Sequence, residues 1–169
     1  MSKADVVARA ITDRLAPGSA LVDVEKVAVD LGVVVVRQDT DQAVDAMLIS
    51  RDGRVAIGLS GARPVVTQRF ALAHMIGHYR MHARRDLLLD GLLRRRHARL
   101  SSIPTDREEA EANRFAGALL VPEKAAREAA VRADCSTGAD LVDALAGEFQ
   151  VSRLVMGYRL VLLGVIIDA

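Results

Sequence analysis

The sequence has few of the residues that mark secreted, disulfide-stabilised proteins. Its 169 residues include one cysteine, Cys135, so no disulfide can form within the chain, and we expect a reducing compartment, the cytoplasm. Tryptophan is absent, and only three phenylalanines and two tyrosines are present. The core must therefore be built from aliphatic side chains and methionine, which favours helices accompanied by a few strands.

Long apolar runs and a large net charge are also absent. No stretch is long enough to cross a bilayer, and residues 1–15 lack the apolar stretch of a signal peptide, so we expect no membrane association. The formal net charge of +1 gives no general attraction to nucleic acid. Several arginines do gather locally, so direct nucleic-acid binding by the Arg84–Arg99 segment is an alternative. No aromatic residue is interleaved there, which favours a solvated segment.

The spacing of apolar residues predicts helices at both ends of the chain and strands between them. In the predicted helices apolar residues recur every three or four positions, and Asp23 is the expected N-cap of the second helix. β-Branched residues gather in the predicted strands, and Asp52-Gly53 predicts a tight hairpin. The predicted helices are 6–15, 24–31, 65–82, 106–120, 122–132, 139–149 and 152–163, and the predicted strands are 33–36, 46–49 and 54–58.

These elements predict a compact, mostly helical α+β fold with a small mixed or antiparallel three-stranded sheet. We expect residues 1–169 to form one domain. Within it, 1–64 form the N-terminal helices and sheet, 65–122 the helices of the candidate site, and 123–169 a C-terminal helical part. Residues 84–104 mix leucines with arginines, which predicts a short helical or irregular excursion. Residues 139–163 have the outline of a helix-turn-helix, but the second helix is so apolar that packing against the core is favoured.

Two histidines in the long predicted helix are the first candidates for chemistry. His74 and His78 lie four residues apart, so their imidazoles project from one helix face, where they can bind one metal ion. A carboxylate at Glu109, at the start of the next helix, would complete a His, His, Glu set with an open position for water. The alternatives are ordinary core or surface histidines, and a first-turn carboxylate favoured by the helix dipole.

The residues around these candidates resemble the ImmA/IrrE family of metallopeptidases. Residues 69–79 read RFALAHMIGHY, where family members typically show R-F-T-L-A-H-E-x-G-H-Y. Residues 109–122 read EAEANRFAGALLVP, where they show E-x-E-A-N-x-F-A-x-x-L-L-x-P. The resemblance implies a compact zincin-like fold in which His74, His78 and Glu109 hold Zn²⁺. It also implies action on a helix-turn-helix repressor protein, because family members commonly relieve such repressors.

The chain departs from this family at the position that carries catalysis. In H-E-x-x-H enzymes the glutamate takes a proton from the attacking water and passes it to the leaving amine, and here Met75 stands at that position. A thioether cannot accept this proton, and removing a general base costs on the order of 10² to 10⁴ in rate. We therefore expect peptidase activity to be weak or lost. The alternative function is a non-catalytic protein-binding module that keeps the fold.

Residues near the candidate ligands are expected to play supporting roles. His82 lies on the same helix face one turn further on, where contact with a ligand residue or exposure to solvent is favoured over metal ligation. Glu108 and Glu111 are alternates for the third ligand, although helical spacing turns them about 100° or more from it. Asn113 is a candidate for an outer hydrogen bond to a ligand. Tyr158 is expected to be a buried tyrosine with one hydrogen bond, an electrophilic role at the metal being its alternative.

Overall fold

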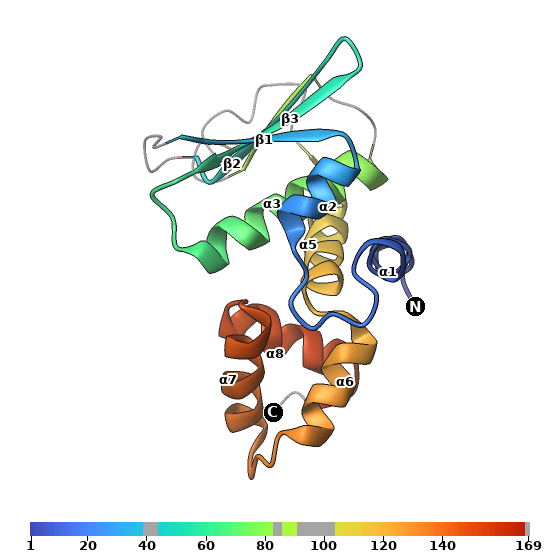
Figure 1. Ribbon diagram of the computed structural model, residues 1–169, viewed down its shortest axis with the longest axis vertical. Coiled ribbons are helices and arrows are strands. Elements are labelled where there is room, and N and C mark those ends of the chain that lie inside the picture. The colour runs from blue at the N-terminus through green and yellow to red at the C-terminus, as the bar shows by residue number, and fades with distance from the viewer. Residues whose placement is uncertain (39–43, 83–85, 91–103, 168–169) are drawn as a thin grey trace.

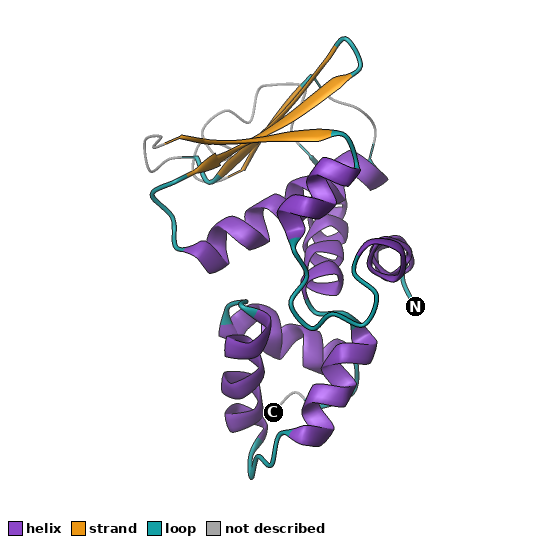
Figure 2. Ribbon diagram, viewed as in Figure 1, coloured by secondary structure: helices purple, strands orange, loops and turns teal. Residues whose placement is uncertain are grey.

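The computed structural model describes residues 1–38, 44–82, 86–90 and 104–167 and has the expected mostly helical α+β architecture. The sheet lies at one end of the molecule, the helices lie on one side of it, and α6, α7 and α8 form the opposite end (Figures 1 and 2). The elements in chain order are α1 (Lys3–Leu15), α2 (Val24–Asp30), β1 (Val33–Gln38), β2 (Ala46–Arg51), β3 (Arg54–Ser60), α3 (Val65–Met81), β4 (Leu87–Asp90), α5 (Asp106–Leu120), α6 (Glu123–Arg132), α7 (Gly138–Phe149) and α8 (Arg153–Leu162).

Side-chain caps set the beginnings of several helices. Asp23, the predicted N-cap of α2, accepts hydrogen bonds from the backbone N–H groups of Glu25 and Lys26 at 3.1 and 3.0 Å. α5 begins with a capping box, in which Thr105 and Glu108 each accept a hydrogen bond from the other's backbone N–H. These bonds pair the N–H groups that a first helical turn leaves without partners. The helix starts are therefore encoded locally, and they lie close to their predicted positions.

The sheet is mixed. Its strand order within the described residues is β1-β3-β2-β4, with β1 parallel to β3 and the other two pairings antiparallel. Asp52 and Gly53 connect β2 to β3 with φ angles of 49° and 75°. Positive φ at both central residues is characteristic of a type I′ turn, so the predicted hairpin is confirmed.

A fourth strand corrects the prediction of a three-stranded sheet. Leu87–Asp90, expected to belong to a short helical or irregular excursion, forms β4 and pairs with β2. The register places Leu87 opposite Ile49 and Leu89 opposite Met47. This pairing gives partners to backbone N–H and C=O groups on the edge of β2, a requirement that does not show in the local sequence of β4. The remainder of the excursion, at 84–85 and 91–103, lies outside the described residues.

One face of the sheet packs on α3, which runs beneath it (Figure 1). Alternate residues of the strands point toward this helix, and Leu48, Ile57 and Leu59 are buried there. On the other face Val34 and Val36 of β1 remain exposed. The sheet thus covers one side of α3, and α5 packs against another side of α3.

The C-terminal helices pack against the rest of the molecule, as the apolar pattern predicted. Phe149 of α7 and Met156 and Leu160 of α8 are fully buried. A recognition helix would need its side chains free to enter a groove, so these positions are ordinary core. In the part of the chain that the structure describes, no helix is both long and apolar enough to cross a membrane.

Gly77 allows α3 and α5 to approach closely. A Cβ atom at this position would lie 2.9 Å from Phe115 Cδ1 and 3.3 Å from Ala112 Cα, both on α5. The first distance is shorter than any normal carbon–carbon contact, so a larger residue would push the two helices apart. The absence of a side chain at Gly77 therefore determines how closely α5 packs against α3.

Gly77→Ala is expected to lower the free energy of unfolding by about 1–3 kcal/mol, because overpacking outweighs the gain in helix propensity. Urea denaturation followed by circular dichroism measures this change. Gly117→Ala on α5 is the matched control, since a Cβ there meets nothing within 4 Å. The control should gain about 0.5–1 kcal/mol. Equal effects of the two substitutions would contradict the steric role of Gly77.

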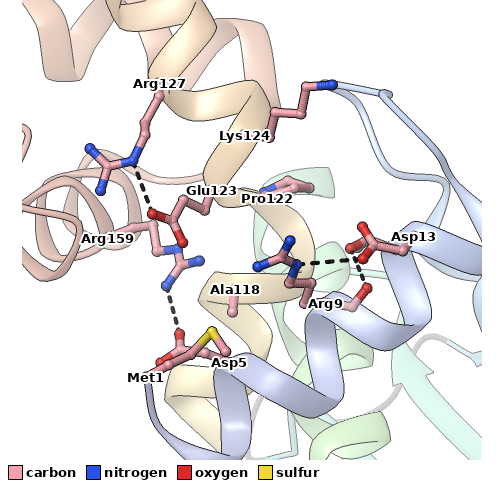
Figure 3. Close-up of a pocket in the computed structure, with 11 residues that line it drawn as sticks. Met1, Asp5, Arg9, Asp13, Ala118, Pro122, Glu123, Lys124, Arg127 and Arg159 are labelled. Atoms are coloured by element: carbon pink, nitrogen blue, oxygen red, sulfur yellow. Dashed lines mark hydrogen bonds and ion pairs between the residues drawn. The ribbon is translucent and has the colours of Figure 1, made fainter.

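A buried ion network joins the two ends of the chain. Asp5 of α1 accepts hydrogen bonds from Arg159 of α8 at 2.8 Å and from Arg114 of α5 at 2.9 Å. Arg159 is only 5% exposed and also donates to the carbonyl oxygen of Val121. Asp5 and Arg159 face each other beside a cavity of about 410 Å³ between α1, α5 and α6 (Figure 3). Only one part of this network, the Ser2–Asp5 capping box, has a local signal in the sequence, so the network was not predicted.

Candidate metal centre

The structure brings the three predicted ligands together. His74 and His78 lie one turn apart on α3, and Glu109 comes from the first turn of α5. All three residues are buried, and one ligand atom of each lies within 4.8 Å of the others. Buried imidazole and carboxylate groups need partners, and here each faces the other two.

The ligand atoms lie close enough together for all three residues to bind one metal ion. The Nε2 atoms of His74 and His78 are 3.0 Å apart; His74 Nε2 lies 3.4 Å from Glu109 Oε2, and His78 Nε2 lies 3.4 Å from the other carboxylate oxygen, Oε1. Ligand atoms about 2.0–2.1 Å from a metal ion, at tetrahedral angles, would be separated by about 3.3 Å. The three donors are therefore compatible with a single metal ion without rearrangement of the helices.

Electrostatics favour the protonation states that bind metal. Burial alone would raise the pKa of Glu109, but its close contacts with His74 and His78 outweigh this effect and hold the pKa well below its usual range. Burial lowers the pKa of His78, an effect that the nearby carboxylate of Glu109 only partly offsets. Near pH 7 the carboxylate is thus ionised and His78 is neutral, as metal ligands must be.

Comparison with known families agrees with this geometry. Residues 28–161, well over half of the chain, match the model of a peptidase family described as the IrrE N-terminal-like domain. The chain belongs to this IrrE-like family. The match confirms the resemblance drawn from the two motifs, and it spans the sheet, α3 and α5. A search of curated proteins finds no match.

Outer hydrogen bonds hold both histidines of this IrrE-like chain. Asn113 Oδ1 lies 2.9 Å from His74 Nδ1, the contact expected for this asparagine. His82 Nδ1 lies 2.9 Å from His78 Nδ1, and the side chain of His82 is 4% exposed. Each imidazole therefore uses Nδ1 for an outer partner and turns Nε2 toward Glu109.

The two alternate carboxylates are engaged elsewhere. Glu108 accepts hydrogen bonds from the backbone N–H and the hydroxyl of Thr105 at 2.7 and 3.1 Å. Glu111 lies 3.3 Å from His82 Nε2 and also pairs with Arg107. Of the three glutamates in the first two turns of α5, Glu109 is the one that faces both His74 and His78.

Met75 is part of the hydrophobic core. Its side chain is fully buried, with 0% exposure. In the sequence it follows His74 directly and precedes His78 by three residues. The position that carries a glutamate in H-E-x-x-H peptidases therefore holds a buried thioether, which offers no proton acceptor.

An apolar groove of about 560 Å³ lies between α3, α5 and α8. Phe70 and Asn113 line it, and the Phe70 ring centroid is 6.3 Å from that of His74, so the groove adjoins the metal centre. Tyr158 also lines the groove and is 59% exposed, which corrects the expectation of a buried tyrosine. Tyr158 lies in the middle of α8 and points to the surface, because the inward face of this helix is occupied by Met156 and Leu160.

None of the arginines of the Arg84–Arg99 segment belongs to the described residues. These are Arg84, Arg85 and the arginines between 94 and 99, so the alternative of nucleic-acid binding by Arg84–Arg99 stays a prediction.

Proposed function

We propose that this IrrE-like protein binds Zn²⁺ through His74, His78 and Glu109 and acts as a regulator on a helix-turn-helix repressor protein. The observation that carries the proposal is the convergence of three buried side chains, each with one ligand atom within 4.8 Å of the others. Two imidazoles and one carboxylate are the ligands of catalytic zinc sites, which keep a fourth position open. The repressor follows from the family resemblance and is a proposal about the partner.

Proteolysis by this protein is proposed to be weak or lost. Bound zinc supplies a Lewis acid that polarises a carbonyl and activates water. The chain must supply the group that takes the proton, and Met75 has none to offer. Glu108 and Glu111, the nearest carboxylates in sequence to the third ligand, are held by Thr105 and His82. Regulation would then depend on binding the partner more than on cutting it.

Elemental analysis of the purified protein tests the metal site. Near-stoichiometric zinc is expected in the wild-type protein and little in His74→Ala or Glu109→Ala, because two donors hold the ion far more weakly than three. Zinc at about 100 times its Kd should raise the free energy of unfolding by about 2.7 kcal/mol.

Glu128→Ala is a suitable control for the metal analysis, since Glu128 lies on α6 in an exposed pair with Lys124. It should keep its zinc. A wild-type protein that stays free of zinc after incubation with excess metal would refute the proposed metal site.

A non-catalytic binding module is the second candidate, and the groove beside the metal centre favours it. Leu154 at the groove is 82% exposed, and apolar side chains form most of the lining. An exposed apolar groove of this kind suits an apolar segment of a protein partner. The elemental analysis separates the two candidates, because a binding module that inherited only the fold needs no zinc.

A further inference from the structure

We propose that His82, held by Glu111, is a positioning residue that selects the tautomer of His78 and so directs its Nε2 lone pair at the metal position. The inference rests on the proposed metal site and assigns a role to groups outside the three ligands. His82 is the C-cap of α3, one turn beyond His78. Its ring stands 4.9 Å from the ring of His78, centroid to centroid.

The chain of hydrogen bonds begins at the surface with Arg107 and Glu111. Arg107 Nε donates to Glu111 Oε1 at 2.9 Å, and the other carboxylate oxygen faces His82 Nε2 at 3.3 Å. Glu111 is paired with the guanidinium of Arg107, so this group is an ionised carboxylate. An ionised carboxylate only accepts hydrogen bonds, and His82 must therefore present an N–H at Nε2.

The donor and acceptor roles of His82 also determine those of His78. A neutral imidazole has one N–H, so a His82 that donates from Nε2 can only accept at Nδ1. Its Nδ1 lies 2.9 Å from His78 Nδ1, and the proton of this contact must then belong to His78. With its single N–H at Nδ1, His78 has a bare lone pair at Nε2. That atom is the one that faces His74 and Glu109.

The tautomer of His74 is selected in the same way, by Asn113. Its Nδ1 lies 2.9 Å from the carbonyl oxygen Oδ1 of Asn113, which can only accept, so its Nε2 is also bare. Two imidazole lone pairs and an ionised carboxylate then converge with no proton between them. Only a cation satisfies three acceptors in this arrangement, which means that the outer residues prepare the site for a metal before it arrives.

Burial makes the choice of tautomer depend on these protein groups. The side chain of His82 is 4% exposed and that of His78 is 2% exposed, so solvent does not compete for their ring nitrogens. Glu111 is 29% exposed and Arg107 is 87% exposed, which places the charged end of the chain of bonds at the surface. Loss of such an outer partner typically costs 10- to 100-fold in metal affinity.

The test compares His82→Leu, which removes both ring nitrogens, with His82→Gln, whose amide can accept from His78 and donate to Glu111. Zinc affinity, measured by competition with a chromogenic chelator, is expected to fall about 10- to 100-fold in His82→Leu and to be largely kept in His82→Gln. Arg80→Ala, at an exposed position on the same helix, is the control and should bind zinc as the wild type does. Circular dichroism melting verifies that each variant folds.

A second readout needs no metal. Long-range ¹H–¹⁵N correlation spectra of the metal-free protein should show His78 as the Nδ1–H tautomer in the wild type and in His82→Gln, and as a mixture in His82→Leu. If the wild type binds zinc and His82→Leu binds it equally well, the role of His82 is refuted while the metal site stands. If the wild type binds no zinc, the metal site fails, and the spectra still decide the role of His82: an unchanged His78 tautomer in His82→Leu would overturn it.

Discussion

Asp5→Ala is expected to lower the free energy of unfolding by about 3–5 kcal/mol, the cost of breaking a buried ion network by removing one partner. Asp5 is 9% exposed and joins α1 to Arg114 on α5 and Arg159 on α8. Without it, the guanidinium of Arg159 stays buried with its charge uncompensated. Urea denaturation followed by circular dichroism measures the loss.

Asp13→Ala on the same helix is the matched control. Asp13 is 70% exposed and pairs with Arg9 in a surface ion pair at 3.5 Å. Surface pairs of this kind contribute little, so the control should change the free energy of unfolding by less than about 0.5 kcal/mol. Similar losses in the two variants would show that the network does not stabilise the fold.

The dependence of stability on pH provides a further check on Asp5. Burial raises the pKa of Asp5, but hydrogen bonds from Arg114, Ser2 and Arg159 outweigh it and hold the pKa well below its usual range. A carboxyl whose pKa is lower in the folded state stabilises the fold above its unfolded pKa of about 3.9 and loses this contribution as the pH falls further. Asp5→Asn should therefore flatten the decrease in stability below about pH 4.

Met75→Glu is expected to raise the rate of peptide hydrolysis by the zinc-loaded protein about 10²- to 10⁴-fold, the usual contribution of a general base. The substitution places a proton acceptor next to His74, at the position of the glutamate in the H-E-x-x-H motif. A carboxylate at a position with 0% exposure is costly without a partner, so the variant should be less stable in the absence of metal. A quenched fluorescent peptide library with many sequences measures the rate without knowledge of the natural partner.

Met75→Gln separates the chemistry from the change in shape. Glutamine has nearly the size of glutamate but cannot take up a proton, so this control should stay as inactive as the wild type. Equal hydrolysis rates for wild type, Met75→Glu and Met75→Gln, all loaded with zinc, would count against Met75 as the cause of weak proteolysis.

Several elements were predictable because their signals are local. The N-cap at Asp23, the Asp52-Gly53 hairpin and the helix that carries His74 and His78 depend on residues within a few positions of each other. β4 was not predictable in this way, because its pairing with β2 joins segments about forty residues apart and is decided by the open edge of the sheet. Its short run of leucines fits a helix equally well.

The sequence by itself determined which residues can bind a metal and which family the chain resembles, since both follow from residue types at fixed spacing on predicted helices. Only the tertiary structure decided that Glu109, and not Glu108 or Glu111, meets the two histidines. It also brought Asp5 to Arg159, 154 positions away in the sequence. Such contacts depend on how closely the helices pack, and here Gly77 allows α5 to lie against α3. Packing distances of this kind are set by the whole core, so no periodic pattern in the sequence predicts them.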